Sequence, residues 1–416
     1  MELSQGVRVF LSITVLIGIS LHFIGLAGLL RFRLRKTPKI EAQHPFPSVT
    51  LIKPCYSNID NEEMNFKAFF EQDYPGKIQI LFVVSQITDP IVPIIQKLIA
   101  LYPKIDANLI ISTTRKAYWL KVDALYDAHQ VAKNEIIIWS DSDTIVHSHY
   151  FQEMAATLQD PQIALVTTPQ YDARINNFAT ALKTLGNNTD IACYVMIYDL
   201  LVKNKKTAFG HSLGFRRSDF KEFEQEAWNT LNNSFADDLV IPQLFAMHGK
   251  KVVFRNIYCP VQYSSKSFIQ MIHQQERFSL CQKMVIGKWK LTAGLILSPQ
   301  ISATLLLFLD PSNPLTLSLF VATLCTRIGL SFLFESLILK STKMNMRYFW
   351  TIPLWDLLRI YLVFHAFFQN KVEYHDRKYQ LFEKLRIQEI PPTPISENPH
   401  TEWVKQENVS TSAHSP

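Results

Sequence analysis

Residues 135–143 read Glu-Ile-Ile-Ile-Trp-Ser-Asp-Ser-Asp, and this short stretch decides the fold. Glu135–Trp139 is a compact run of apolar and β-branched residues with polar residues after it, so it predicts a short buried strand. Two carboxylates, Asp141 and Asp143, follow the strand directly. Ligands of open α/β sheets bind at the carboxyl ends of the strands. The stretch therefore predicts a sheet whose ligand-binding edge carries a pair of aspartates.

Similar apolar runs alternate with helical stretches around this segment, which indicates a parallel α/β sheet covered by helices on both faces. Strands are expected at Val49–Lys53, Ile78–Ser85, Asn108–Ser112 and Glu135–Trp139, with helices between them at Glu62–Glu71, Pro93–Leu101 and Val122–Ala132. Less regular elements follow, with strands at Ile163–Thr168, Ala208–Phe215 and Lys251–Arg255 and helices at Asp237–Met247 and Ser267–Met284. Neither G-x-G-x-x-G nor G-x-x-x-x-G-K-[ST] occurs, so a nucleotide must be held without a glycine-rich loop.

The composition combines a soluble domain with membrane segments. The 416 residues are 48% hydrophobic and 19% charged, with a mean hydropathy of +0.04, which excludes disorder along the whole chain. Val9–Leu30 contains no charged residue and is long enough to cross a bilayer. Three more apolar runs lie near the C-terminus, at Leu291–Leu309, Leu315–Leu339 and Phe349–Phe368. The intervening residues contain no comparable run and are expected to fold as a soluble domain.

These features divide the chain into five parts. We expect a membrane anchor at 1–30, a basic linker at 31–47, the α/β domain at 48–285, a membrane region of about three segments at 286–370 and a partly disordered tail at 371–416. Arg327 with Glu335, and Asp356 with Arg359, interrupt the last two apolar runs. Because such charges are costly in lipid, structural pairing is favoured over a headgroup or acceptor pocket. If all four runs cross, which we favour, the tail lies on the opposite side from the domain. If the fourth run is interfacial or re-entrant, the tail lies on the domain side.

The charge distribution orients the chain. Val9–Leu30 lacks the basic start and the A-x-A exit of a cleaved signal peptide, which favours an uncleaved anchor. The positive-inside rule then places the domain in the cytoplasm, because five basic residues follow the anchor: Arg31, Arg33, Arg35, Lys36 and Lys39. This cluster supplies most of the net charge of +6, so the charge does not indicate nucleic-acid binding. The five cysteines have no C-x-x-C spacing and indicate neither a zinc site nor a disulfide framework.

Carboxylates at the expected ligand edge are the strongest candidates for chemistry. Asp141 and Asp143 are two residues apart, so they can jointly hold a hard divalent cation, Mg²⁺ or Mn²⁺, that also takes phosphate oxygens. A solvated turn is the alternative interpretation of this pair. Asp89 follows the strand Ile78–Ser85 at the same edge, where it either contacts a ligand or caps the helix that begins near Pro90.

Two lysines and a second acidic pair extend the candidate site. Lys53 ends a strand, where it can meet phosphate or lie on the surface. Lys121 opens a helix, where a cation is electrostatically disfavoured, and this hints at an anionic partner. Asp237 and Asp238 precede an amphipathic helix. Like-charged neighbours raise each other's pKa, which suits a general base, whereas helix capping is the alternative.

The last candidates lie on the helix expected at Ser267–Met284. Gln274 and Arg277 share one helix face because they are three residues apart, and Phe278 follows them. An arginine in this place can clamp a pyrophosphate with two hydrogen bonds, or it can anchor the helix at the membrane interface.

The order of these motifs resembles the inverting family 2-type glycosyltransferases, and within them the ceramide glucosyltransferase group. The order is an aspartate, a D-x-D, a second acidic pair and Q-x-x-R followed by an aromatic residue, all between membrane segments. Landmarks similar to those of the group are Lys53-Pro54, Phe69-Phe-Glu-Gln-Asp-Tyr-Pro75, Trp139-Ser-Asp-Ser and Gly210-His-Ser-Leu-Gly214. The resemblance covers about residues 48–385.

The resemblance implies a GT-A fold, which is a Rossmann-like mixed sheet, and a UDP-sugar donor. By position, Asp89 matches the acid that contacts the nucleotide, and Asp141 with Asp143 matches the D-x-D that holds ribose and metal. Asp238 matches the catalytic base. The remaining matches lie on the donor side and comprise the Q-x-x-R-W motif that closes over the diphosphate and two lysines: Gln274, Arg277, Phe278, Lys53 and Lys121. Phe278 stands where that motif has Trp.

The expected function is therefore a membrane-bound inverting transferase. It would move a sugar, with glucose favoured, from a UDP-sugar to a lipid hydroxyl such as that of ceramide. A processive polysaccharide synthase shares the same acids but normally needs more membrane helices to form a channel. A non-enzymatic membrane scaffold, the alternative of another class, requires no ordered acids at strand ends.

Overall fold

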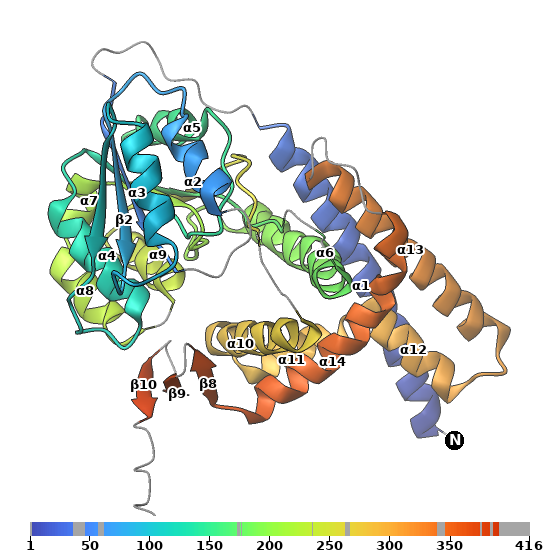
Figure 1. Ribbon diagram of the computed structural model, residues 1–416. Helices are drawn as coiled ribbons and strands as arrows, with labels where there is room; N and C mark the ends of the chain where they lie inside the picture. The colour runs from blue at the N-terminus through green and yellow to red at the C-terminus, as the bar shows by residue number, and fades with distance from the viewer. Residues whose placement is uncertain are drawn as a thin grey trace, which may run out of the picture.

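The computed structural model describes residues 2–35, 46–56, 62–172, 175, 177–234, 236–262, 267–338, 346–374, 377–382 and 386–390. Within these residues an α/β domain stands beside a group of long helices (Figure 1). Most of the predicted linker, and the predicted disordered tail after Pro391, lie outside the described residues.

A seven-stranded mixed sheet forms the centre of the α/β domain, in the order β3-β2-β1-β4-β6-β5-β7. The strands are β1 (Val49–Pro54), β2 (Ile78–Val84), β3 (Asp106–Ile111), β4 (Ile136–Trp139), β5 (Ile163–Thr167), β6 (Leu213–Arg216) and β7 (Lys251–Phe254). The first four strands run parallel, as predicted, whereas β6 is antiparallel to both of its neighbours. The α/β expectation is confirmed, and the antiparallel strand makes the sheet mixed, as the resemblance implied.

Helices bury both faces of this sheet. Successive side chains of a strand point to opposite faces, so Ile137 and Trp139 of β4 enter one core and Ile136 and Ile138 the other. The first core is covered by α4 (Leu120–Val131), α7 (Arg217–Lys221), α8 (Glu224–Leu231) and α9 (Asp237–Met247). The second is covered by α2 (Glu62–Phe70), α3 (Val92–Leu101) and α5 (Tyr150–Leu158). The carboxyl ends of β1, β2 and β4 are thereby fixed at one edge.

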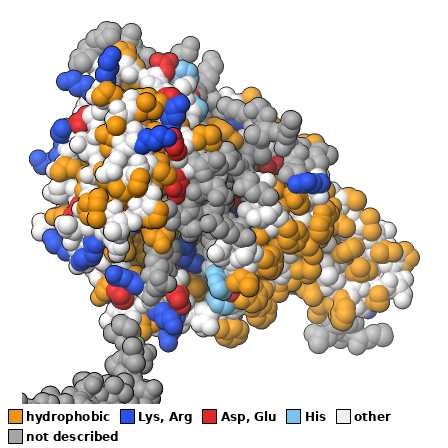
Figure 2. Space-filling model, in the orientation of Figure 1, with side chains coloured by type: hydrophobic (Ala, Val, Ile, Leu, Met, Phe, Trp, Pro, Cys, Tyr) orange, Lys and Arg blue, Asp and Glu red, His pale blue; other side chains and the backbone are white. Residues whose placement is uncertain are grey.

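The remaining helices carry the apolar segments. They are α1 (Glu2–Arg33), α6 (Phe178–Leu201), α10 (Phe268–Ile286), α11 (Lys288–Ile296), α12 (Pro299–Leu309), α13 (Pro314–Ile338), the 3₁₀ turn η1 (Met346–Thr351) and α14 (Ile352–Phe368). Among the described residues, three helices are long and apolar enough to cross a membrane: Gln5–Arg33, Pro314–Ile338 and Arg347–Phe368. The second predicted run is instead a pair, α11 and α12, bent by 63°. In Figure 2 hydrophobic side chains cover this part of the face shown, whereas charged side chains gather on the α/β domain.

Helix α6 was not predicted from the sequence, and it joins the two parts of the molecule. It leaves the sheet after β5, packs along α1 and returns to β6. The approach to α1 is close, because a Cβ added at Gly25 would lie 2.5 Å from Cys193 Sγ. Small residues allow such close contacts between membrane helices. A Cβ at Gly186 would likewise collide with the Trp355 indole of α14.

Asp190 of α6 organises the charges that interrupt the apolar helices. Its carboxylate lies 2.7 Å from an Arg327 nitrogen and 3.0 Å from an Arg359 nitrogen. Arg327 also pairs with Asp356 at 3.0 Å. The expectation of structural pairing is thus confirmed, but the expected partners are wrong. Arg327 turns to Asp190 and Asp356 and not to Glu335, and Arg359 reaches Asp190.

Asp190→Ala should destabilise the protein strongly. It removes the carboxylate that pairs with Arg359 and leaves the buried Arg327 with Asp356 alone, and breaking a buried ion pair costs about 3–5 kcal/mol. Thermal unfolding in detergent measures the effect. Asp310→Asn is the control, because Asp310 pairs at 2.8 Å with Arg8, whose side chain is 42% exposed. Such pairs contribute at most about 1 kcal/mol. Equal thermal unfolding midpoints for the two variants would contradict a structural role for Asp190.

A three-stranded antiparallel sheet after α14 packs on the α/β domain. Its strands are β8 (Lys371–Tyr374), β9 (Arg377–Leu381) and β10 (Ile387–Ile390). The Ile387 N–H donates to the Asn233 carbonyl at 2.9 Å, and the Tyr379 ring lies 6.0 Å from that of Trp119. Strands β8, β9 and β10 therefore lie on the same side as the domain, and the predicted opposite placement of this part of the tail is wrong.

Candidate active site

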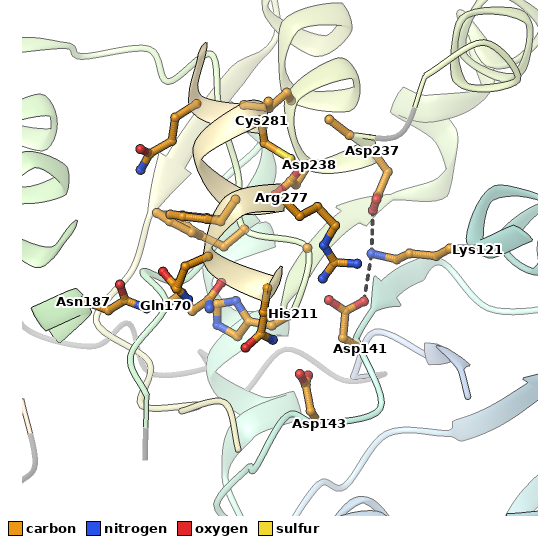
Figure 3. A pocket seen from close by; sticks show the side chains of 18 of the residues that line it. Lys121, Asp141, Asp143, Gln170, Asn187, His211, Asp237, Asp238, Arg277 and Cys281 are labelled. Atoms are coloured by element: carbon orange, nitrogen blue, oxygen red, sulfur yellow. Dashed lines mark ion pairs between the residues drawn. The ribbon is translucent and has the colours of Figure 1, made fainter. Parts of the chain in front are cut away.

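The carboxyl ends of the parallel strands open into one large cavity. Its volume is about 1240 Å³, and Asp89 after β2 and Asp141 and Asp143 after β4 line it. The other predicted residues that line it are Lys121, Asp238, Gln274, Arg277 and Phe278. Figure 3 shows that the acids and Arg277 converge on this space from the sheet edge, α9 and α10. The fold thus brings together every predicted site residue except Lys53.

Lys121 links the two acidic motifs. Its Nζ lies 2.8 Å from Asp141 Oδ1 and 3.0 Å from Asp237 Oδ2 (Figure 3). Burial lowers the pKa of Lys121, but the negative charges of Asp141 and Asp237 outweigh this and raise it above its usual value. The anionic partner expected for a lysine in the first turn of a helix is therefore this pair of carboxylates. A Cβ at Gly210 would lie 3.0 Å from the same nitrogen, so a larger residue at this position would crowd the Lys121 ammonium group.

Asp238 is the carboxylate best suited to accept a proton. Both Asp237 and Asp238 line the cavity, but Asp237 is held in an ion pair by Lys121. Burial and then the negative charge of Asp237 raise the pKa of Asp238 to about 7. A base is most effective when its pKa is close to the working pH. The arrangement gives the two neighbouring acids different tasks.

Asp143 fits a divalent cation. Its Oδ1 is buried and has no hydrogen-bond partner, and burial followed by the charge of Asp141 raises the pKa of Asp143 to about 7. A carboxylate oxygen in this condition is a suitable ligand for a hard cation. No group of three or more His, Cys, Asp or Glu side chains in the described ranges could hold a metal. Asp143 would therefore need further oxygens from Asp141, water or a bound phosphate.

Helix α10 brings the Q-x-x-R motif to the cavity. The hydroxyl of Ser267 accepts the Gln270 N–H at 3.2 Å and so caps its first turn. Gln274, Arg277 and Phe278 then line the cavity, and 38% of the Phe278 surface is exposed. The Phe278 ring is therefore open to a ligand.

The structure places Lys53 differently from the prediction. Its side chain is fully buried and does not line the cavity. The Nζ donates to the Asp141 carbonyl at 2.5 Å and lies 4.3 Å from the centre of the Phe69 ring. Lys53 thus supports the D-x-D loop through its backbone. Asp89 lines the cavity and accepts the Ile91 N–H at 3.0 Å, but the N-cap of α3 is Ile91, so Asp89 does not cap this helix, and its contact with a nucleotide stays a prediction.

The cavity also reaches the apolar helices, where Asp190, Arg359 and Lys290 line it together with apolar side chains. There it runs between α6, α10, α11 and α14, and its apolar wall is formed by Ile191, Tyr194, Val285, Ile286, Leu291, Gly294, Leu362 and Val363. A single cavity therefore connects an acidic and basic edge of the α/β domain with the apolar helices. Such a space can hold a molecule with a polar end and a hydrocarbon end.

Residues 10–387 match the model of glycosyl transferase family 21. The chain belongs to this family. Curated relatives include ceramide glucosyltransferase 3 of Caenorhabditis elegans, which is 26% identical over 196 residues, 44% of this chain and 42% of that protein. The ceramide glucosyltransferase of Candida albicans is 36% identical over 99 residues, 23% of this chain and 18% of that protein. The chain thus spans less than half the length of these relatives.

This family 21 chain is also similar to solved structures. A mannosyltransferase from Pyrobaculum calidifontis, in complex with GDP-Man and Mn²⁺, covers 84% of this chain and 99% of its own, with a TM-score of 0.48 and 18% identity. A Staphylococcus aureus protein, TarS 1-349 in complex with UDP-GlcNAc, covers 83% and 99% with a TM-score of 0.35 and 12% identity.

Several polar residues of this family 21 site were not predicted. Lys183 and Asn187 come from α6, a helix that was not predicted from the sequence. A local signal that could have indicated α6 is the capping box of Asn177 and Thr180 at its N-terminus. His211 lies in the quoted Gly210 landmark but had no assigned role. Burial lowers the pKa of His211 to about 4, so its ring is neutral at pH 7. Its Nε2 lies 3.1 Å from Thr168 Oγ1.

Proposed function

We propose that this protein is an inverting glycosyltransferase that moves a sugar, with glucose favoured, from a UDP-sugar to a lipid hydroxyl such as that of ceramide. The single observation that carries the proposal is the cavity that joins the acidic sheet edge to the apolar helices. A water-soluble donor and a lipid acceptor can meet only at a site that is open both to water and to the lipid bilayer. Membership of family 21 and the named ceramide glucosyltransferases support the same acceptor class.

Asp238 would act as the base in this reaction. Its carboxylate takes the proton of the acceptor hydroxyl while that oxygen bonds to C1 of the sugar. The bond between C1 and the β-phosphate oxygen of UDP breaks at the same time. A single displacement inverts the configuration at C1, and it requires one base and no protein nucleophile.

The departing UDP gains negative charge, and the cavity wall has groups to stabilise it. Arg277 can offer two parallel N–H donors to the diphosphate. Asp143, with Asp141 close by, would hold a divalent cation. When bound, such a cation neutralises charge on the leaving phosphate oxygens. Phe278 and Asp89 would contact the rest of the donor.

Turnover should fall on the acid side of neutrality. The pKa of Asp238 is raised to about 7, so the carboxylate is mostly protonated at pH 6 and mostly ionised at pH 8. Only the ionised form can act as base, and below its pKa the rate should fall about tenfold for each pH unit. Turnover measured at saturating donor between pH 5 and 9 tests this. A flat profile from pH 5 to 8 would rule out this carboxylate as the base.

The decisive experiment identifies the product. The full chain, expressed in membranes that lack related activities, is supplied with UDP-glucose or other UDP-sugars and with ceramide or other lipids, and the lipids are analysed by mass spectrometry. A lipid carrying one hexose in β linkage from an α-linked donor is the expected result. A long polymer would indicate a polysaccharide synthase. No product with any pair, together with no UDP binding, would favour a scaffold.

We also propose that the domain faces the cytoplasm. The basic residues at the end of α1 support this orientation by the positive-inside rule. UDP-sugars are then drawn from the cytosol, and the acceptor enters from the adjoining leaflet between α10, α11 and α14.

A further inference from the structure

Lys183 is a buried cation at the donor end of the cavity. It lies on α6, its side chain is only 3% exposed, and it lines the same space as Arg277. Its Nζ donates to Gln274 Oε1 at 3.0 Å and lies 3.9 Å from Asp172 Oδ2. Burying an ammonium group is costly, so these contacts and whatever anion the cavity receives must compensate for it.

The contact with Lys183 determines how the Gln274 amide is turned. An ammonium group has three donors and no acceptor, so the carbonyl oxygen of the amide must face it. The Nε2 donors of Gln274 then lie on the opposite side of the amide. Lys183 therefore decides the orientation of this one side chain on α10.

Lys183 and Arg277 are two cations that line the same cavity. The carboxylates of Asp172 and Asp143 stabilise the Lys183 ammonium group, whereas Arg277 opposes it. An anion bound beside Lys183 and Arg277 would relieve the repulsion between these two cations. A diphosphate is such an anion, and Asp143 would hold a divalent cation that neutralises part of its charge.

We propose that Lys183 is a positioning residue of the donor site. It holds Gln274 with its N–H donors turned towards the diphosphate, and it adds a second positive charge to that of Arg277. The inference rests on the proposed function, because it takes the ligand to be a nucleoside diphosphate. It also gives α6, which packs on the membrane helix α1, a direct role at the donor.

Calorimetric binding of UDP and of uridine to the full chain in detergent tests the inference. Lys183→Met should weaken UDP binding on the order of tenfold, since it removes a charge-assisted hydrogen bond. Uridine, which has no phosphate, should bind as it does to the wild type. Lys183→Arg should restore UDP affinity to within about threefold, because arginine keeps the charge and donors. In a Gln274→Ala background, Lys183→Met should have a smaller effect than alone.

Lys205→Met is the matched control. Lys205 is also buried and pairs with Asp199 at 2.9 Å, but it does not line the cavity. Its loss should leave UDP binding unchanged. Should Lys183→Met fail to fold, Lys183→Gln takes its place. If Lys183→Met loses equal affinity for UDP and for uridine, or binds UDP as the wild type does, the inference about Lys183 is overturned and the proposed function is not affected. A wild-type chain that binds no UDP would overturn the proposed function as well.

Discussion

Replacing Asp238 by asparagine should abolish sugar transfer and leave UDP binding nearly intact. Asparagine has almost the same shape as aspartate but cannot accept a proton from the acceptor hydroxyl. A positioned general base contributes about 10²–10⁴-fold to a rate, so we expect a loss near the upper end of this range. The measurements are product formation by mass spectrometry and UDP affinity by calorimetry, both on the purified full chain.

Asp237→Asn is the matched control for this prediction. Asp237 pairs with Lys121 at 3.0 Å and, through its charge, raises the pKa of Asp238. Its replacement should retain measurable turnover. The acid limb of the pH profile should move to lower pH, because one of the charges that raise the pKa of Asp238 is gone. Near-normal turnover of Asp238→Asn would show the assignment to be wrong, and an inactive Asp237→Asn with normal UDP binding would move the role to Asp237.

The ligand edge could be predicted because its signals are local. The apolar run at residues 136–139 is a strand by composition, and the next polar residues must lie at its carboxyl end. Parallel neighbours place Asp89 at the same edge for the same reason. The helical position of Lys121 indicated an anionic partner, and two carboxylates supply it.

Positions that depend on distant packing could not be predicted in this way. Lys53 ends a strand, but a strand pattern does not show whether the last side chain faces ligand or core, and Phe69 covers it here. The charged residues of α13 and α14 were predicted to pair with near neighbours in the sequence. The common partner of Arg327 and Arg359 is instead Asp190, which comes from α6. The apolarity of α14 likewise shows that it can enter a membrane but not whether it crosses.

Removing divalent cations, or replacing Asp143 by alanine, should remove most of the affinity for UDP. The buried Asp143 Oδ1 has no hydrogen-bond partner, and a divalent cation held there would satisfy it. A cation between a carboxylate and a diphosphate neutralises charge on both, so we expect a loss on the order of a hundredfold in either case. The pKa of Asp143 is raised to about 7, so protons compete with the cation. The cation-dependent part of UDP binding should therefore grow as the pH rises from 6 to 8.

Calorimetry with UDP separates this cation effect from a general weakening of the site. The wild type is titrated with Mn²⁺, with Mg²⁺ and with excess EDTA, and Asp143→Ala is titrated under the same conditions. Asp106→Asn serves as the control, because Asp106 is exposed and pairs with Lys133 far from the cavity lining. If Asp143 holds the cation, EDTA should lower the UDP affinity of the wild type and of Asp106→Asn by the same factor. The UDP affinity of Asp143→Ala should not change, since that variant has no cation to lose. Wild-type affinity that EDTA does not alter would mean that Arg277 and the neighbouring lysines bind the diphosphate alone, and the buried carboxyl of Asp143 would then need another partner.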